Sequence, residues 1–174
     1  GCRFNQHHQE MASPEIFAVA GRYMDVISIN HYRLWEPDAA WMANWEKWSG
    51  KPFIITEFYT KGEDSGLPNN TGAGWNVRTQ ADRGWFYQNF VTELLRSGNC
   101  VGWHWFTYMD NDPQNLKTDP SNRDSNKGVV AWNFEPYTVL LDEMKQLNDC
   151  TYRLIRHLDA EKAEANRKTT DNHE

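Results

Sequence analysis

Four short apolar runs alternate with segments of helical pattern along this chain of 174 residues. The strand-like runs are Cys2–Asn5, Asp25–Tyr32, Pro52–Phe58 and Val101–Tyr108. The helical segments are Ala12–Tyr23, Asp38–Trp48, Gln80–Ser97 and Tyr137–Leu158. Strands that alternate with helices are typical of βα units, in which the strands lie parallel. The sequence therefore predicts an α/β fold with a parallel sheet, and the chain is long enough for one domain with a core.

The third strand-like run ends in an acid. It is the apolar stretch within Lys51–Tyr59, and the carboxylate is Glu57. Strands this apolar are usually buried on both faces, where an unpaired charge is costly. In parallel α/β barrels, reactive groups sit at the carboxyl ends of the strands. We therefore interpret Glu57 as a catalytic carboxylate, with a glutamate in a surface turn or a structural ion pair as the alternative.

Parallel strands bring their carboxyl ends to one edge of the sheet, which would gather polar and aromatic side chains around Glu57. These candidates are Asn5, Asn30, Tyr32, Trp103, Trp105, Asp110 and Asp112. The period of two in a strand places Asn30 and Tyr32 on one face, and Trp103 and Trp105 on one face of theirs. A carboxylate beside a phenol and an amide, with indole rings beneath, suits attack on the anomeric carbon of a sugar.

Two long polar connections, Thr60–Thr79 and Met109–Glu135, follow strand ends and are expected beside Glu57. Long loops in a compact domain are usually functional or disordered. Trp75, in the first of them, is a candidate for contact with a ligand. The chain has nine Trp, seven Tyr and eight Phe. Aromatic rings can serve as sugar platforms, but core packing is the alternative for at least half of them, including the helical stripe Trp41, Trp45 and Trp48.

The composition argues against several other classes. A net charge of −6 disfavours nucleic acid and anionic membranes as partners. No apolar run approaches the roughly 18 residues of a membrane span. The three cysteines are widely spaced, the pair His7 and His8 lacks a third ligand, and the segment from Asp110 to Gln114 lacks the glycine and glutamate of a calcium loop. We therefore expect no metal and no other cofactor.

Several segments, in this order along the chain, resemble the C-terminal half of β-agarase-type glycoside hydrolases. The longer ones are Asp25–Tyr32, Lys51–Tyr59, Gly74–Gln80, Asp82–Phe90 and Val101–Asp112, and the shorter ones are Ser125–Gly128 and Pro136–Leu141. The broader resemblance is to retaining glycosidases on (β/α)8 barrels. It implies that residues 1–158 form strands five to eight of a TIM barrel, the C-terminal half, and that residues 159–174 are a charged tail, frayed or disordered.

The resemblance also assigns roles. Glu57 matches the nucleophile at the end of the seventh strand, Asn30 and Tyr32 match a polar pair on the sixth, and Trp103 or Trp105 matches the aromatic residue of the eighth. The implied reaction is retaining hydrolysis of β-galactosidic bonds in agarose-like galactans. The implied location is secreted or periplasmic in a bacterium.

In the family, the acid/base glutamate ends the fourth strand of the barrel. The resemblance assigns only strands five to eight to this chain, so the fourth strand is not part of it. Glu10 and Asp110 could face the cleft, but neither matches the expected position. We therefore expect the chain to be inactive alone and to have two partners, a galactan oligo- or polysaccharide and the missing N-terminal half of the barrel. The alternative is a non-catalytic carbohydrate-binding or scaffold protein.

Overall fold

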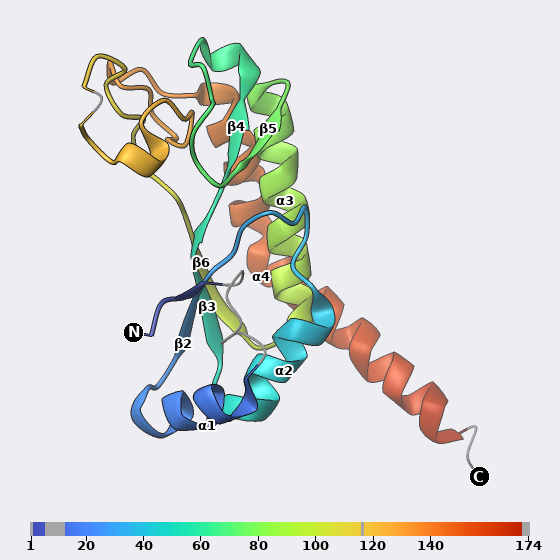
Figure 1. Ribbon diagram of the computed structural model, residues 1–174. Coiled ribbons are helices and arrows are strands. Elements are labelled where there is room, and N and C mark those ends of the chain that lie inside the picture. Colours follow the sequence, from blue (N-terminus) through green and yellow to red (C-terminus); the bar gives the residue numbers. More distant parts are fainter. Residues whose placement is uncertain (1, 6–12, 116, 172–174) are drawn as a thin grey trace.

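The computed structural model describes residues 2–5, 13–115 and 117–171, and a four-stranded sheet lies at its centre (Figure 1). The strands are β1 (Phe4–Asn5), β2 (Ile27–Asn30), β3 (Phe53–Phe58) and β6 (Cys100–Trp105). They lie in the order β1-β2-β3-β6, and each neighbouring pair is parallel. The predicted α/β fold with a parallel sheet is confirmed.

The helices are α1 (Pro14–Tyr23), α2 (Ala39–Ser49), α3 (Gln80–Ser97) and α4 (Thr138–Asp171). Local sequence sets most of their ends. The side chains of Ser13, Asp38 and Thr79 accept hydrogen bonds from the first turns of α1, α2 and α3. Gly50 and Gly98 end α2 and α3 in the left-handed conformation, which glycine adopts at least cost.

The core lies between the sheet and the helices. Alternate residues of the strands, such as Ile29, Phe53 and Ile55, are fully buried there against α2 and α3. Of the predicted helical stripe on α2, Trp45 is fully buried and Trp48 packs against the core at its edge, but Trp41 is 37% exposed. The buried face of α2 is therefore narrower than the stripe indicated.

Helix α4 continues thirteen residues beyond the predicted end at Leu158, as far as Asp171, and projects from the body of the molecule (Figure 1). Oppositely charged side chains one turn apart stabilise a helix that has no apolar face. Nζ of Lys168 lies 2.7 Å from Oε1 of Glu164. Over the described residues, no helix has both the length and the apolar character needed to cross a membrane.

The described residues of the two long connections lie beyond the carboxyl ends of the sheet strands (Figure 1). The first contains β4 (Thr60–Gly62), the 3-10 helix η2 (Glu63–Ser65) and β5 (Trp75–Val77), and β4 pairs parallel with β5. The second contains the 3-10 helix η3 (Pro120–Asn122). Asp124 joins them, because its carboxylate accepts hydrogen bonds from the backbone N–H groups of Asn70 and Thr71.

Candidate active site

A β-bulge decides which way Glu57 faces. Ile29 pairs with Ile55, but the next residue of β2, Asn30, pairs with Glu57 rather than Thr56. Strict alternation from Phe53 and Ile55 would turn Glu57 into the helix-covered core. The extra residue reverses this, as bulges near active sites do. Glu57 therefore shares the uncovered side of the sheet with Asn30, while Phe58 returns to the core.

Two side chains hold the Glu57 carboxylate, Tyr32 from just after β2 and Arg3 from just before β1. The Tyr32 hydroxyl donates a hydrogen bond of 2.8 Å to Oε2. Arg3 forms an ion pair with Oε1, and its Nε donates to the same oxygen at 3.0 Å. Burial, followed by the adjacent carboxylate, raises the pKa of Tyr32 well above its ordinary value. The phenol therefore stays protonated and remains a donor to Glu57.

Glu57 and Tyr32 open into a cavity of about 260 Å³. Its lining comes from the sheet and from both long connections: Arg3, Tyr32, Glu57, Ala73, Phe106, Asp119, Ser121 and Asn122. Both long connections therefore contribute residues to the cavity of Glu57, as the sequence predicted. The arrangement offers an anchored carboxylate, polar groups opposite it, the Tyr32 phenol and the apolar ring of Phe106, which together suit a neutral polar ligand.

Asn30 lies next to the cavity but does not line it. Its side chain is buried, and Oδ1 accepts a hydrogen bond of 2.7 Å from the Thr56 hydroxyl. Trp75, on β5, is 50% exposed and follows Ala73 of the cavity wall by two positions, but it does not line the cavity either. Of the sequence-predicted site residues, the structure brings Glu57 and Tyr32 into the cavity itself.

Trp103 and Trp105 do share one strand face, but it is the face covered by helices. Ile55 pairs with Trp103 and Phe58 with Trp105, and both tryptophans pack against the core. The Trp103 indole donates to the Tyr87 hydroxyl at 2.8 Å, and the Trp105 indole donates to the Lys127 carbonyl at 2.8 Å. The structure therefore places neither at the cavity, because the expected face of β6 was the wrong one.

Phe106 is the aromatic residue that lines the cavity, and sequence reasoning missed it. The signal was present, because the residue after Trp105 points to the opposite side of an extended chain. Asp119, Ser121 and Asn122 were also missed. They come from within a long loop, where no periodic pattern indicates a direction.

Asp110, one of the two alternative acids, has a structural role. It is buried, and its carboxylate accepts hydrogen bonds from the N–H groups of Lys127 and Gly128 at 2.7 Å, the Asn126 amide at 2.9 Å and the Tyr137 hydroxyl at 2.7 Å. It does not line the cavity. Among the described residues no group of His, Cys, Asp and Glu is placed to hold a metal ion. Glu10, His7 and His8 lie outside the described residues.

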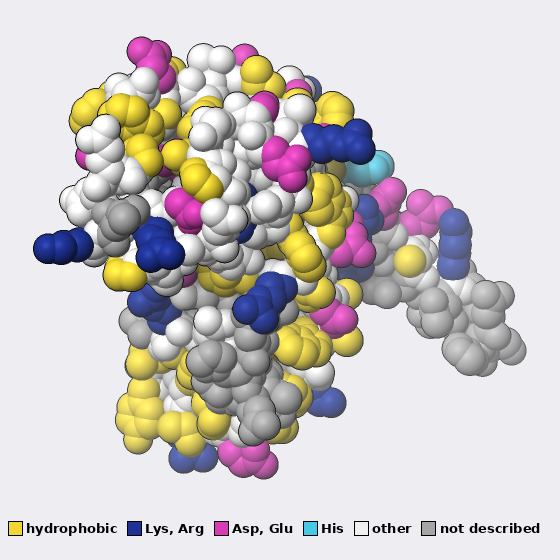
Figure 2. Space-filling view, turned by 45° about the horizontal axis from the view of Figure 1, so that its top comes forward, with side chains coloured by type: hydrophobic (Ala, Val, Ile, Leu, Met, Phe, Trp, Pro, Cys, Tyr) yellow, Lys and Arg dark blue, Asp and Glu magenta, His cyan; other side chains and the backbone are white. Residues whose placement is uncertain are grey.

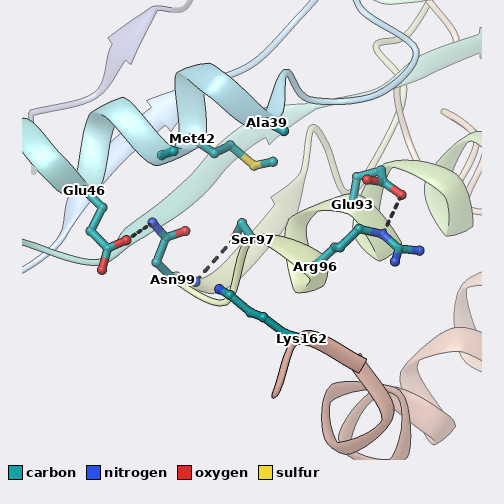
Figure 3. A pocket seen from close by; sticks show the side chains of 9 residues that line it. Ala39, Met42, Glu46, Glu93, Arg96, Ser97, Asn99 and Lys162 are labelled. Carbon is teal, nitrogen blue, oxygen red and sulfur yellow. Dashed lines mark hydrogen bonds and ion pairs between the residues drawn. The ribbon is translucent and has the colours of Figure 1, made fainter. Parts of the chain in front are cut away.

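A second cavity, of about 200 Å³, lies between α2, the end of α3 and the extension of α4 (Figure 3). Met42 and Ala39 line its α2 side, and Lys162 of α4 points toward Asn99. The Asn99 amide donates to Glu46 at 2.7 Å. Asn99 immediately precedes β6, so this cavity is at the amino-terminal end of the strands, opposite to the end where Glu57 lies.

No protein-family model matches the chain. Two characterised proteins of Vibrio sp. (strain JT0107) are similar to it. β-Agarase B is 33% identical over 144 residues, which are 82% of this chain and 14% of that protein. β-Agarase A is 29% identical over 143 residues, 78% of this chain and again 14% of that protein.

Solved structures give the same result. The crystal structure of BpGH50 aligns with a TM-score of 0.80 and 42% identity, covering 90% of this chain and 32% of that one. An exo-β-agarase aligns with a TM-score of 0.74 and 28% identity, covering 88% of this chain and 19% of that one. The resemblance to β-agarases predicted from the sequence motifs is confirmed. The chain spans about a seventh of the two Vibrio agarases and about a third of BpGH50.

Proposed function

We propose that this chain is the nucleophile-bearing part of a retaining glycoside hydrolase that cleaves β-galactosidic bonds in agarose-like galactans. One observation carries the proposal: a strand-end carboxylate, Glu57, is turned by a bulge into an open cavity and held there by Tyr32 and Arg3. Similarity to β-agarases over most of the chain supports the substrate class.

In this mechanism the Glu57 carboxylate attacks the anomeric carbon as the glycosidic bond breaks, and the leaving oxygen takes a proton from a second carboxyl group. That group then accepts a proton from the water that hydrolyses the covalent glycosyl-enzyme and releases Glu57. The Tyr32 hydroxyl and Arg3 fix the carboxylate, so that little reorganisation is needed as the bond forms. Phe106 supplies an apolar face within the same cavity. Asn30 and Trp75 lie just outside the lining, and in the proposed site they contact a longer substrate at the rim.

A retaining enzyme needs a second carboxyl group, protonated before attack, about 5–5.5 Å from the first. The other acid of this cavity's lining, Asp119, is a poor candidate. Burial opposes its ionisation, but hydrogen bonds from Lys127, Ser121 and Asn122 outweigh that and lower the pKa of Asp119 below its ordinary value. It is therefore ionised at neutral pH, and the proposed acid/base residue comes from outside this chain.

We propose further that the chain is the C-terminal half of a (β/α)8 barrel, completed by an N-terminal half. In the described sheet, β1 and β6 are the outer strands. Beside β6 runs a groove of about 320 Å³ with Val101, Tyr152 and Ile155 in its lining. The chain spans 14% of the length of β-agarase B and 32% of that of BpGH50, which leaves room for such a partner segment in a complete protein.

At the other edge of the sheet, next to β1, α1 exposes Ile16, Val19 and Tyr23 at helical spacing. Apolar side chains gather at the lower end of the face in Figure 2. A further βα unit at each edge would cover these surfaces and pair the outer strands. The proposed substrate is an extracellular polymer, so the proposed location of the complete protein is outside the bacterial cytoplasm.

The test is Glu57→Gln in the full-length protein. The expected result is a fall in turnover of about 10³-fold or more on agarose oligosaccharides, with an unchanged unfolding temperature. Glu63→Gln, an exposed glutamate on η2, is the matched control. A 2-fluoro galactoside should label Glu57 covalently, as mass spectrometry of peptides would show. Full activity of Glu57→Gln removes Glu57 from the mechanism, and sugar binding without any hydrolysis by the unmutated protein leaves a carbohydrate-binding role.

A further inference from the structure

A second carboxylate, Asp119, faces the cavity that contains Glu57. It comes from the second long connection, at the start of η3, and its side chain is 30% exposed. Its backbone is left-handed, with φ of 43°, a conformation that aspartate tolerates better than most residues. The loop thus takes a less favourable backbone conformation at the position that puts a carboxylate in the cavity wall.

A buried cation stands behind this carboxylate. Lys127 has a side chain only 4% exposed, and its Nζ lies 2.5 Å from Asp119 Oδ2. The same Nζ lies 5.3 Å from the centre of the Phe106 ring. Ser121 Oγ donates to Asp119 Oδ1 at 2.8 Å, and Asn122 Nδ2 donates to it at 3.3 Å. Asp119 is therefore fixed in place and ionised, with part of its surface open to the cavity.

Hydrogen bonds and ring contacts link the two carboxylates across the cavity. Asn122 Oδ1 accepts a hydrogen bond of 2.5 Å from the Tyr59 hydroxyl. The Tyr59 ring meets the Tyr32 ring edge to face at 5.6 Å, and Tyr32 donates to Glu57. Burial raises the pKa of Tyr59 to about 12, so this donor also keeps its proton. The position of Asp119 is thus set relative to that of Glu57.

Each carboxylate already has its own cation, Arg3 for Glu57 and Lys127 for Asp119. The cavity therefore presents hydrogen-bond acceptors without an unpaired positive charge among its described lining residues. Such a wall suits hydroxyl donors of a neutral sugar. An anionic substituent would face two carboxylates and be repelled.

We propose that Asp119 is a substrate-binding, specificity-determining residue that accepts hydrogen bonds from the hydroxyl groups of a neutral sugar unit beside Glu57 and disfavours sulfated units. This deepens the proposed function and rests on it for the galactan. The competing interpretation is structural, with Asp119 serving only as the counterion that Lys127 needs.

The experiment measures binding to this chain by isothermal titration calorimetry, with a neutral agarose tetrasaccharide and the same tetrasaccharide carrying one sulfate ester. Asp119→Asn should weaken binding of the neutral ligand about tenfold and reduce the preference over the sulfated one. Asp112→Asn, an exposed aspartate in the same loop, is the matched control and should bind as the unmutated chain does.

Asp119→Asn leaves Lys127 buried without its counterion, so a lower unfolding temperature is expected. The double variant Lys127→Met/Asp119→Asn removes both charges and should recover the unfolding temperature but not the affinity. Recovery of full affinity in the double variant, equal binding of the two tetrasaccharides by the unmutated chain, or no binding at all would each overturn the proposal.

Glu57→Gln separates the two roles. Turnover of Glu57→Gln in the full-length protein tests the nucleophile assignment, and tetrasaccharide binding by Asp119→Asn tests the binding role. If Glu57→Gln stays active in the full-length protein while Asp119→Asn still weakens binding, the nucleophile assignment fails and the binding role of Asp119 stands. Loss of turnover in Glu57→Gln with unchanged binding by Asp119→Asn overturns the binding role instead.

Discussion

At the scale of single residues, the orientation of Glu57 depends on one unmatched position in β3. Thr56 takes up the bulge, and its hydroxyl bonds to Asn30, so the extra residue is itself anchored. The carboxylate then meets a donor, Tyr32, from just after β2 and a cation, Arg3, from just before β1. Neither contact follows from the sequence of β3 alone.

Tyr32→Phe tests the anchoring of Glu57. Loss of a hydrogen bond to a carboxylate, worth about 1.5–3 kcal/mol, should lower kcat of the full-length protein by about tenfold to a hundredfold. The control is Tyr87→Phe, because the Tyr87 hydroxyl donates to Asn148 and accepts from Trp103 on the helix side. That change should lower the unfolding temperature and leave kcat unaltered. An unchanged kcat in Tyr32→Phe would show that the phenol does not position the nucleophile.

At the scale of elements, β6 presents Trp103 and Trp105 to the core, and Phe106, the residue after β6, lies on the cavity side. Trp105 packs between β3 and α3, with Phe58 at 5.5 Å and the Arg83 guanidinium at 5.3 Å from its ring. Arg83 is buried, and the desolvation lowers its pKa to about 10. It joins α3 to the loops, because it donates to the carbonyls of Thr60 and Gly128. The core side of β6 thus supports the loops that form the cavity.

Two alanine substitutions test the core side and the cavity side of this part of the sheet separately. Trp105→Ala should lower the free energy of unfolding by about 3–5 kcal/mol in denaturant titrations, because it empties a packed site. Phe106→Ala should cost less stability and instead weaken tetrasaccharide binding by about 1–3 kcal/mol, the scale of burying a large apolar side chain. The reverse pattern, with affinity lost at Trp105 and kept at Phe106, would restore the tryptophan as the sugar platform.

At the scale of the whole molecule, the sheet has an outer strand on each side, and outer strands pair readily with other chains. Val101, 59% exposed on β6, lies beside the apolar groove of Tyr152 and Ile155. In the proposed barrel the missing half covers both the outer strands and the groove beside β6. In this chain alone they favour self-association.

Val101→Lys should reduce that self-association, because a charged residue on an edge strand opposes further pairing. Sedimentation velocity at several concentrations measures the effect. Val139→Lys, a valine 50% exposed on α4, is the control and should change little. A chain that is monomeric at every concentration before substitution, and that hydrolyses agarose unaided, contradicts the half-barrel proposal.

The sequence by itself determined the order of the four strands of the main sheet and the four helices, the bounds of α3 and the position of Glu57 at a strand end, but it missed β4 and β5. These depend on local signals: apolar period, capping residues and turn-forming glycines. It also determined that Trp103 and Trp105 share a face. Periodicity relates residues within one strand, so this much needs no tertiary information.

Only the tertiary structure decided that Trp103 and Trp105 lie on the helix-covered face of the sheet, because this depends on where the helices pack. It also decided that a bulge turns Glu57 to the other side and that Asp119, from a distant loop, stands in the same cavity. The register between strands and the path of a long loop are set by contacts between residues far apart in the chain. No local pattern encodes them, and for this reason the position of Glu57 at a strand end was predictable while the opposite wall of its cavity was not.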